Sequence, residues 1–271
     1  MSRLATRFAE LKDRSRTALI PYVMAHDPSP EITLPLMHAM VDAGADAIEL
    51  GAPFSDPMAD GPVIQAAAER SLAHGTSMHD VLDLVKAFRE TDNETPVIVM
   101  GYLNPIEVMG YRAFAQQAAE SGVDGVITVD MPPIEAHDYL VELNEAGIDP
   151  VFLLAPTSTE QRIKALAKVA SGFVYYVSLK GVTGASTLDV SSVEQRLALI
   201  REHIDLPVGV GFGISDAESA AKVAACADAV VVGSAIVKKM TLNNGQSEQE
   251  RATIIKEISD ILSEMRAAMD A

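Results

Sequence analysis

Three acidic residues in the stretch 46–65 are the strongest candidates for chemistry. Glu49 lies inside the short apolar run 47–50, and Asp56 and Asp60 follow it in a loop that contains three prolines. Burial in an apolar strand disfavours the charged form of a carboxyl group and raises its pKa toward neutrality. A carboxyl with such a pKa can exchange protons at physiological pH, as general acid–base catalysis requires. The stretch therefore predicts a site of proton transfer.

Each of these acids also has a structural interpretation. Strand alternation places Glu49 on the opposite face from its two neighbours, where a nearby Lys or Arg could simply neutralise it. Asp60 precedes Gly61-Pro62, a context that suits the N-cap of a helix starting at Pro62. Alternatively, Asp60 could close over a site and accept a hydrogen bond from a substrate N–H, and spacing alone does not decide between these. Asp56 could cap, form an ion pair or contact another subunit.

Three glycine clusters late in the chain are candidates for binding phosphate. The segments 211–215 and 233–235 follow two apolar runs, and 181–186 follows another. Glycine lets backbone N–H groups close on a phosphate, and a helix N-terminus adds partial positive charge. The same glycines could serve only as tight turns. Their recurrence after successive apolar runs favours phosphate binding.

Composition limits the class of protein. The 271 residues carry 21 Lys and Arg against 38 Asp and Glu, a formal net charge of −17. Such acidity argues against nucleic acid and anionic membranes as partners. The single cysteine, Cys226, cannot form an internal disulfide, and no Cys/His cluster suggests a metal site. No segment reads as a signal peptide or a membrane span, so we expect a cytoplasmic enzyme or binding protein.

Eight apolar runs and the helical patterns between them supply the framework. The runs are continuous rather than alternating, as in parallel strands covered on both faces. The expected strands are 18–24, 46–50, 96–100, 124–129, 149–154, 173–178, 207–211 and 228–232. The expected helices are 3–13, 31–43, 62–73, 78–91, 111–120, 135–146, 159–170, 192–203, 215–225 and 247–268.

Several helices end in the same Gly-X-Asp pattern, at 44–46, 122–124 and 147–149. Glycine supplies the left-handed helix end, and the recurrence indicates one βα unit per repeat. Eight such units without a linker predict one domain over residues 1–271, a (β/α)8 TIM barrel with an extra N-terminal helix. A doubly wound sheet is the alternative. In a barrel, functional groups lie in the loops at the carboxyl ends of the strands, and the long loops 51–61 and 179–191 belong to that end.

At this point the sequence resembles a known family, the tryptophan synthase alpha subunits. The stretch 49–65, Glu-Leu-Gly-Ala-Pro-Phe-Ser-Asp-Pro-Met-Ala-Asp-Gly-Pro-Val-Ile-Gln, is similar to the most specific motif of that family. The segments 101–106, 180–185, 211–215 and 232–237 support the resemblance, which runs in order along nearly the whole chain.

The resemblance implies retro-aldol cleavage of indole-3-glycerol phosphate to indole and glyceraldehyde 3-phosphate. It also implies a beta subunit that receives the indole through a tunnel within an alpha2beta2 heterotetramer. This chain then needs no cofactor of its own, because pyridoxal phosphate belongs to the beta subunit.

The resemblance assigns roles to individual residues. Glu49 is the general acid/base that protonates ring carbon C3, and Asp60 holds the indole N–H. Thr183 orders the loop after the sixth strand, and Asp56 is left to contact a partner. The phosphate-binding residues are Gly184, Gly213, Gly233 and Ser234. The residues that line the indole pocket are Tyr22, Met100, Tyr102, Ile127, Tyr175, Phe212 and Val231.

The chain departs from the family pattern at three positions, and none of them removes a catalytic group. Tyr22 stands where Phe is frequent, His26 where Gly is common, and Leu179 where some members have Arg.

Two other functions are alternatives to this one. The first is a related phosphosugar enzyme, which the 49–65 motif disfavours. The second is a non-catalytic phosphate-ligand sensor that activates a partner, which the Glu49 and Asp60 pair disfavours.

Overall fold

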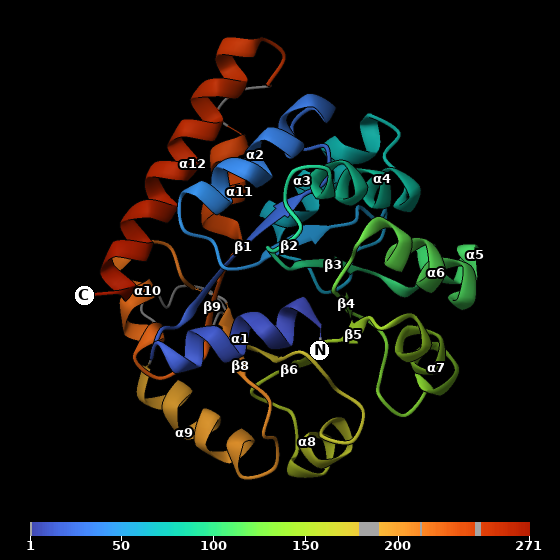
Figure 1. Cartoon of the computed structure of the whole chain (residues 1–271), viewed down its shortest axis with the longest axis vertical. Coiled ribbons are helices and arrows are strands. Elements are labelled where there is room, and N and C mark those ends of the chain that lie inside the picture. The colour runs from blue at the N-terminus through green and yellow to red at the C-terminus, as the bar shows by residue number, and fades with distance from the viewer. Residues whose placement is uncertain (1, 179–189, 212, 242–244) are drawn as a thin grey trace.

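A parallel barrel surrounded by helices forms the framework in the computed structural model, which describes residues 2–178, 190–211, 213–241 and 245–271 (Figure 1). The strands are β1 (Ala18–Met24), β2 (Ile48–Gly51), β3 (Val97–Gly101), β4 (Gly125–Thr128), β5 (Asp149–Pro150), β6 (Phe152–Leu154), β7 (Val174–Val177), β8 (Val208–Gly211) and β9 (Ala229–Val232). The helices are α1 (Arg3–Asp13), α2 (Pro30–Asp42), α3 (Pro62–Ala73), α4 (Met78–Arg89), α5 (Leu103–Met109), α6 (Tyr111–Ser121), α7 (His137–Ala146), α8 (Glu160–Leu166), α9 (Val190–Arg201), α10 (Ala217–Ala224), α11 (Ser234–Met240) and α12 (Glu248–Met269).

The sheet closes on itself through a single broken strand. Its order is β5-β4-β3-β2-β1-β9-β8-β7-β6, with every pair parallel. The two strands at the ends of this order, β5 and β6, are separated in the chain only by Val151. The Val151 N–H donates to the Val126 carbonyl at 3.0 Å, so the run 149–154 continues alongside β4. The predicted (β/α)8 barrel is confirmed, and the doubly wound alternative is wrong.

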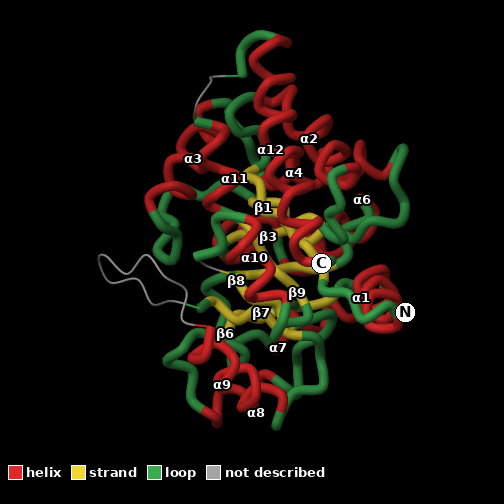
Figure 2. The backbone as a smooth tube through the Cα atoms, turned by 90° about the vertical axis from the view of Figure 1, so that its left-hand side faces the viewer, coloured by secondary structure: helices red, strands yellow, loops and turns green. Residues whose placement is uncertain are grey.

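Two apolar layers fix the direction of each strand side chain. One layer packs between the strands and the surrounding helices. The other fills the barrel interior and includes Leu4, Phe8 and Leu11 of α1. These three residues share the face that their spacing predicts, and α1 uses them to close one end of the barrel (Figure 2). The opposite end, where the strands finish, is left for the functional loops.

Aspartates of the Gly-X-Asp pattern attach the strands at the end closed by α1. Asp46 and Asp124 each accept a backbone N–H from the start of the preceding strand and pair with an arginine, and Asp228 does the same without the glycine. The contacts are Asp46 with Leu19 N (2.9 Å) and Arg266 (3.1 Å), Asp124 with Val97 N (2.8 Å) and Arg89 (2.7 Å), and Asp228 with Val208 N (2.8 Å) and Arg201 (3.0 Å). The pattern marks helix ends and also aligns neighbouring strands.

The predicted elements differ from the structure at a few places. The segment 103–109, expected to be part of a loop, forms α5, whose first N–H donates to the Asp130 carboxylate at 2.7 Å. The segment 234–240, for which no helix was predicted, forms α11. The helix expected over 159–170 ends at Leu166. Both unexpected helices have only seven residues, too few for a clear apolar period.

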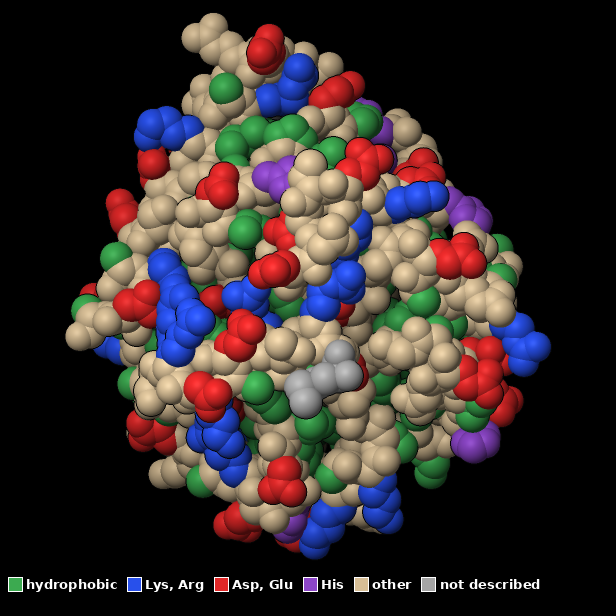
Figure 3. Space-filling model, viewed as in Figure 1, with side chains coloured by type: hydrophobic (Ala, Val, Ile, Leu, Met, Phe, Trp, Pro, Cys, Tyr) green, Lys and Arg blue, Asp and Glu red, His purple; other side chains and the backbone are tan. Residues whose placement is uncertain are grey.

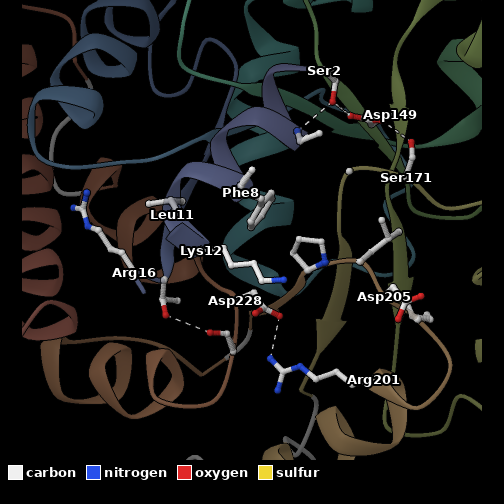
Figure 4. A pocket seen from close by; sticks show the side chains of 18 of the residues that line it. Ser2, Phe8, Leu11, Lys12, Arg16, Asp149, Ser171, Arg201, Asp205 and Asp228 are labelled. Atoms are coloured by element: carbon white, nitrogen blue, oxygen red, sulfur yellow. Dashed lines mark hydrogen bonds and ion pairs between the residues drawn. The ribbon is translucent and has the colours of Figure 1, made fainter. Parts of the chain in front are cut away.

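A cavity of about 970 Å3 lies beside α1, at the end of the barrel away from the functional loops (Figure 4). Two of its acids have partners in its own lining: Asp228 pairs with Arg201, and Asp149 accepts from Ser2 and Ser171. The surrounding face carries Lys and Arg interspersed with Asp and Glu (Figure 3). We place the proposed chemistry at the other end of the barrel, where the strands finish.

Among the helices of the described segments, none combines the length and the apolar composition that a membrane span needs.

Candidate active site

Glu49 lies on β2 with its side chain directed into the barrel mouth. It is 1% exposed, and its Oε2 atom has no hydrogen-bond partner among the residues that the structure describes. No Lys or Arg of the described segments forms an ion pair with it, so the neutralised-acid interpretation is not supported. Burial, followed by the nearby Asp60 charge, raises the pKa of Glu49 to about 8. The carboxyl is therefore largely protonated at neutral pH and able to donate a proton.

Asp60 lies two residues before α3, near the end of the connection from β2, and does not cap the helix. The N-cap of α3 is Gly61, and no side chain accepts a hydrogen bond there. The capping interpretation is therefore wrong. Burial raises the pKa of Asp60. A hydrogen bond from the Tyr102 hydroxyl to the Asp60 carboxylate partly offsets this rise. The same hydroxyl oxygen accepts a hydrogen bond from the Ala59 N–H, with 3.0 Å between nitrogen and oxygen. The Tyr102 ring stacks on the Phe54 ring, with 5.3 Å between the ring centroids.

Helix α3, which begins two residues after Asp60, is anchored at its far end. Arg70 makes two hydrogen bonds to the fully buried Asp27 carboxylate, at 2.6 and 2.9 Å. Ser71 donates to the Ala25 carbonyl at 2.6 Å. These contacts tie α3 to the connection that follows β1. The start of the helix, with Asp60, is thereby held at the mouth between β1 and β2.

The predicted pocket residues separate into two groups. Five of them line the upper barrel interior around Glu49: Tyr22, Met100, Ile127, Tyr175 and Val231. Tyr102 lies outside these interior clusters, and its hydroxyl contacts the Asp60 loop, so its place in the indole pocket stays a prediction. Phe212 lies outside the described residues. The structure therefore gathers mostly apolar side chains on the same inner side of the barrel as the Glu49 carboxyl group.

Two glycines make room for two of the pocket tyrosines, a feature that the sequence analysis missed. A Cβ at residue 51 would overlap the Tyr22 hydroxyl and lie 2.7 Å from Cζ of that ring. A Cβ at residue 211 would overlap the Tyr175 hydroxyl and lie 2.8 Å from its Cζ. Both glycines end strands that carry inward residues. A glycine at the end of an otherwise apolar strand is the available signal, because it marks close approach of another group.

The predicted phosphate residues lie partly in the described structure. Gly213 follows β8 with φ of +80°, a conformation that favours glycine. Gly233 follows β9, and Ser234 is the first residue of α11. Because β8 and β9 pair in register, these two turns are neighbours. Gly184 and Thr183 lie outside the described residues.

The fold and the buried Glu49, whose Oε2 atom has no partner in the described segments, define a (β/α)8-barrel protein with an ionisable group at the carboxyl ends of its strands. A family model described as "Tryptophan synthase alpha chain" matches residues 8–269. The chain belongs to the tryptophan synthase alpha chain family, and it is a lyase of tryptophan biosynthesis.

Known relatives agree with this assignment along the whole chain. The tryptophan synthase alpha chain of Thioalkalivibrio sulfidiphilus is 62% identical over 270 residues, covering 100% of both chains. That of Nitrosococcus oceani is 60% identical over 272 residues, covering 100% of this chain and 98% of the relative. A crystal structure of tryptophan synthase subunit alpha from Legionella pneumophila superposes with a TM-score of 0.91 at 44% identity, covering 100% of this chain and 99% of that one.

Proposed function

We propose that this chain cleaves indole-3-glycerol phosphate by a retro-aldol reaction, releasing indole and glyceraldehyde 3-phosphate. The observation that carries the proposal is Glu49, a largely protonated carboxyl buried among apolar side chains, with one oxygen that has no partner in the described residues. Cleavage turns the indole ring into a leaving group, and ring carbon C3 must gain a proton for this. A buried carboxyl with a pKa of about 8 is a suitable donor at neutral pH.

In the proposed reaction, Glu49 first gives its proton to C3 of the indole ring. Positive charge then develops at the ring nitrogen, where Asp60 accepts a hydrogen bond from the N–H. The bond between C3 and the glycerol carbon breaks, and its electron pair restores the indole. The glycerol hydroxyl becomes the aldehyde oxygen and loses its proton to the ionised Glu49, which returns to its starting state. Protons and electrons balance with no cofactor on this chain.

The remaining site residues would bind rather than react. We propose that the chamber formed by Tyr22, Met100, Ile127, Tyr175 and Val231 holds the indole ring, with Phe212 completing it. The glycine turns at Gly213 and Gly233, together with Ser234, Gly184 and Thr183, would hold the phosphate and the loop over it. Backbone N–H groups suit this task in a chain of net charge −17, because they attract phosphate without a basic patch.

We further propose that a beta subunit, which carries the pyridoxal phosphate, docks on the loops at the carboxyl ends of β2, β3 and β4. Three apolar side chains are strongly exposed there: Met58 (83%), Val108 (81%) and Ile134 (89%). Asp56 is exposed beside Met58, and both line a surface hollow of about 300 Å3. Exposed apolar groups rimmed by polar ones are typical of protein–protein contact sites. This placement would put the partner beside the chamber from which indole leaves.

The experiment is an indole-release assay on the purified chain, alone and with a beta subunit. Glu49→Gln should lower kcat by at least about 100-fold, because the variant carries no transferable proton. Asp60→Asn should lower kcat by about tenfold or more through loss of a charged hydrogen-bond acceptor. Asp83→Asn, on the exposed face of α4, is the control and should match the unmodified protein. Full activity in Glu49→Gln would overturn the acid–base assignment. A chain that binds phosphate ligands but never releases indole would instead be a sensor.

A further inference from the structure

The hydroxyl group of Tyr22 has no task in the reaction proposed above, since a pocket wall needs only the ring. Tyr22 on β1 is the register partner of Glu49 on β2. Both side chains are buried, at 6% and 1% exposure, and both point into the barrel mouth. Residues opposite each other on neighbouring strands share one layer of the sheet surface. The phenol and the carboxyl group therefore face the same enclosed space.

Gly51 determines where the hydroxyl lies. The Tyr22 ring crosses from β1 onto the inner face of β2, since a Cβ at residue 51 would overlap its hydroxyl. Residue 51 is on the same face as Glu49 and one layer nearer the mouth, roughly 7 Å further along the strand. The Glu49 side chain bridges most of that rise when it extends toward the mouth. The phenol oxygen thus lies at the layer of Gly51, toward which the Glu49 side chain can extend.

The surroundings make this hydroxyl a donor. Burial raises the pKa of Tyr22 well above its ordinary value, and the nearby acids raise it further, so the phenol keeps its proton. The titratable groups that face it are Asp60, Glu49, Asp27 and Tyr102. Those that face Glu49 are Asp60, Tyr22 and Tyr175. All of these are acids or phenols. Within the described structure, no cation is available to stabilise the Glu49 anion.

We propose that Tyr22 is a positioning residue whose hydroxyl donates a hydrogen bond to the Glu49 carboxylate while that group is ionised. The catalytic part of this proposal rests on the function proposed above. After Glu49 has given up its proton, it is a buried anion beside Asp60, and its Oε2 atom has no hydrogen-bond partner in the described residues before that step. A charge-assisted hydrogen bond stabilises such an anion and holds it in one orientation. A phenylalanine at position 22 would form the same wall without doing this.

The test is the titration of Glu49 in Tyr22→Phe, followed by NMR on protein labelled with 13C at the glutamate carboxyls. The Glu49 signal is assigned by its absence in Glu49→Gln. Loss of the donor should raise the pKa of Glu49 by about one unit, because a hydrogen bond to the ionised form lowers a carboxyl pKa. Tyr139→Phe is the control: Tyr139 is equally buried, but its hydroxyl bonds Thr128 outside the barrel mouth. An unchanged Glu49 titration in Tyr22→Phe would overturn the proposal.

Kinetics separates positioning from simple pocket shape. Tyr22→Phe should lower kcat by about tenfold while KM stays within about twofold, and the high-pH limb of kcat should move up with the Glu49 pKa. A change in KM alone would mean that the hydroxyl only shapes the pocket, if the pKa of Glu49 stays the same both in the NMR titration and in the pH profile of kcat. The NMR titration uses no substrate. The pKa of Glu49 could shift in Tyr22→Phe while the unmodified protein releases no indole. That result would support the hydrogen bond and contradict the proposed reaction.

Discussion

At the scale of single residues, the site depends on one carboxyl group placed where charge is unfavourable. Glu49 is buried, and the charge of the nearby Asp60 disfavours its ionised form further. A salt bridge would stabilise the ionised form and lower the pKa, which would remove the proton needed at neutral pH. The absence of an ion pair at Glu49 in the described structure is therefore what makes it useful as an acid. Reactivity at this position is obtained at the expense of stability.

This cost depends on pH. The pKa of Glu49 is raised in the folded state to about 8, from an ordinary value of 4.5. The folded protein therefore holds a proton that the unfolded chain releases between these values, and stability falls as pH rises through that window. The loss from this group amounts to about 3 kcal/mol at pH 7. Glu49→Gln should relieve it, so thermal unfolding should show a larger gain in melting temperature at pH 8 than at pH 5. An equal gain at both pH values would contradict a raised pKa.

At the scale of secondary-structure elements, α3 positions Asp60 through contacts at the opposite end of the helix. The start of α3 has no side-chain cap, and its loop 54–59 is largely exposed. The anchoring comes from the buried Asp27 and its two hydrogen bonds to Arg70. A rigid helix fixed at one end can transmit that placement to Asp60, which lies two residues before its other end. The ion pair is thus a structural contact with a consequence at the site.

Arg70→Ala should therefore affect both folding and activity. It leaves the Asp27 carboxylate buried without a partner, which should lower the free energy of unfolding by about 3 kcal/mol. We also expect kcat/KM for indole release to fall, because Asp60 loses its fixed position. Urea unfolding and the indole assay provide the two measurements. Lys222→Ala removes an exposed ion pair with Glu218 and should change stability by less than about 1 kcal/mol. Equal effects of the two substitutions would contradict the anchoring role.

At the scale of the whole molecule, the barrel is closed at one end and open at the other. Helix α1 inserts Leu4, Phe8 and Leu11 among inward side chains of the strands, and Phe8 packs on Phe173 with ring centroids 5.6 Å apart. The aspartate–arginine pairs beside α1 align the strand starts. Polar and apolar contacts thus stabilise the end of the barrel away from Glu49. The end that contains Glu49 can then carry glycines and, in the described structure, a buried carboxyl oxygen without a partner.

Phe8→Ala tests this division. Removing the buried ring should lower the free energy of unfolding by about 3–5 kcal/mol through lost burial and the cavity left behind. Activity per folded molecule should be preserved at low temperature, because α1 lies at the opposite end from the proposed site. Denaturant unfolding gives the first quantity and the indole assay at 10–15 °C the second, roughly where stability is greatest. Glu10→Ala, on the exposed face of the same helix, should remain within about 0.5 kcal/mol.

Much of the fold follows from local properties of the sequence. Continuous apolar runs and Gly-X-Asp helix ends are determined by burial and backbone conformation over a few residues, so eight βα units and their closure into a barrel could be predicted. The spacing of the apolar residues in α1 likewise predicts the face that the helix buries. Short elements were not, because seven residues in α5 or α11 carry too little periodicity.

The sequence by itself determined the residue types: a carboxyl inside an apolar strand, glycines after late strands, and a motif shared with a known family. Only the tertiary structure decided between alternatives that depend on partners far apart in the chain. It excluded Asp60 as a helix cap, placed the Tyr102 hydroxyl against the Asp60 loop, and showed Tyr22 and Gly51 fitted together on the strands around Glu49. The physical reason is that a pKa, a hydrogen bond and a close approach each depend on which groups folding brings together. Glu49 has its unusual pKa because strands, helices and a loop from distant parts of the chain exclude water and countercharge from one point.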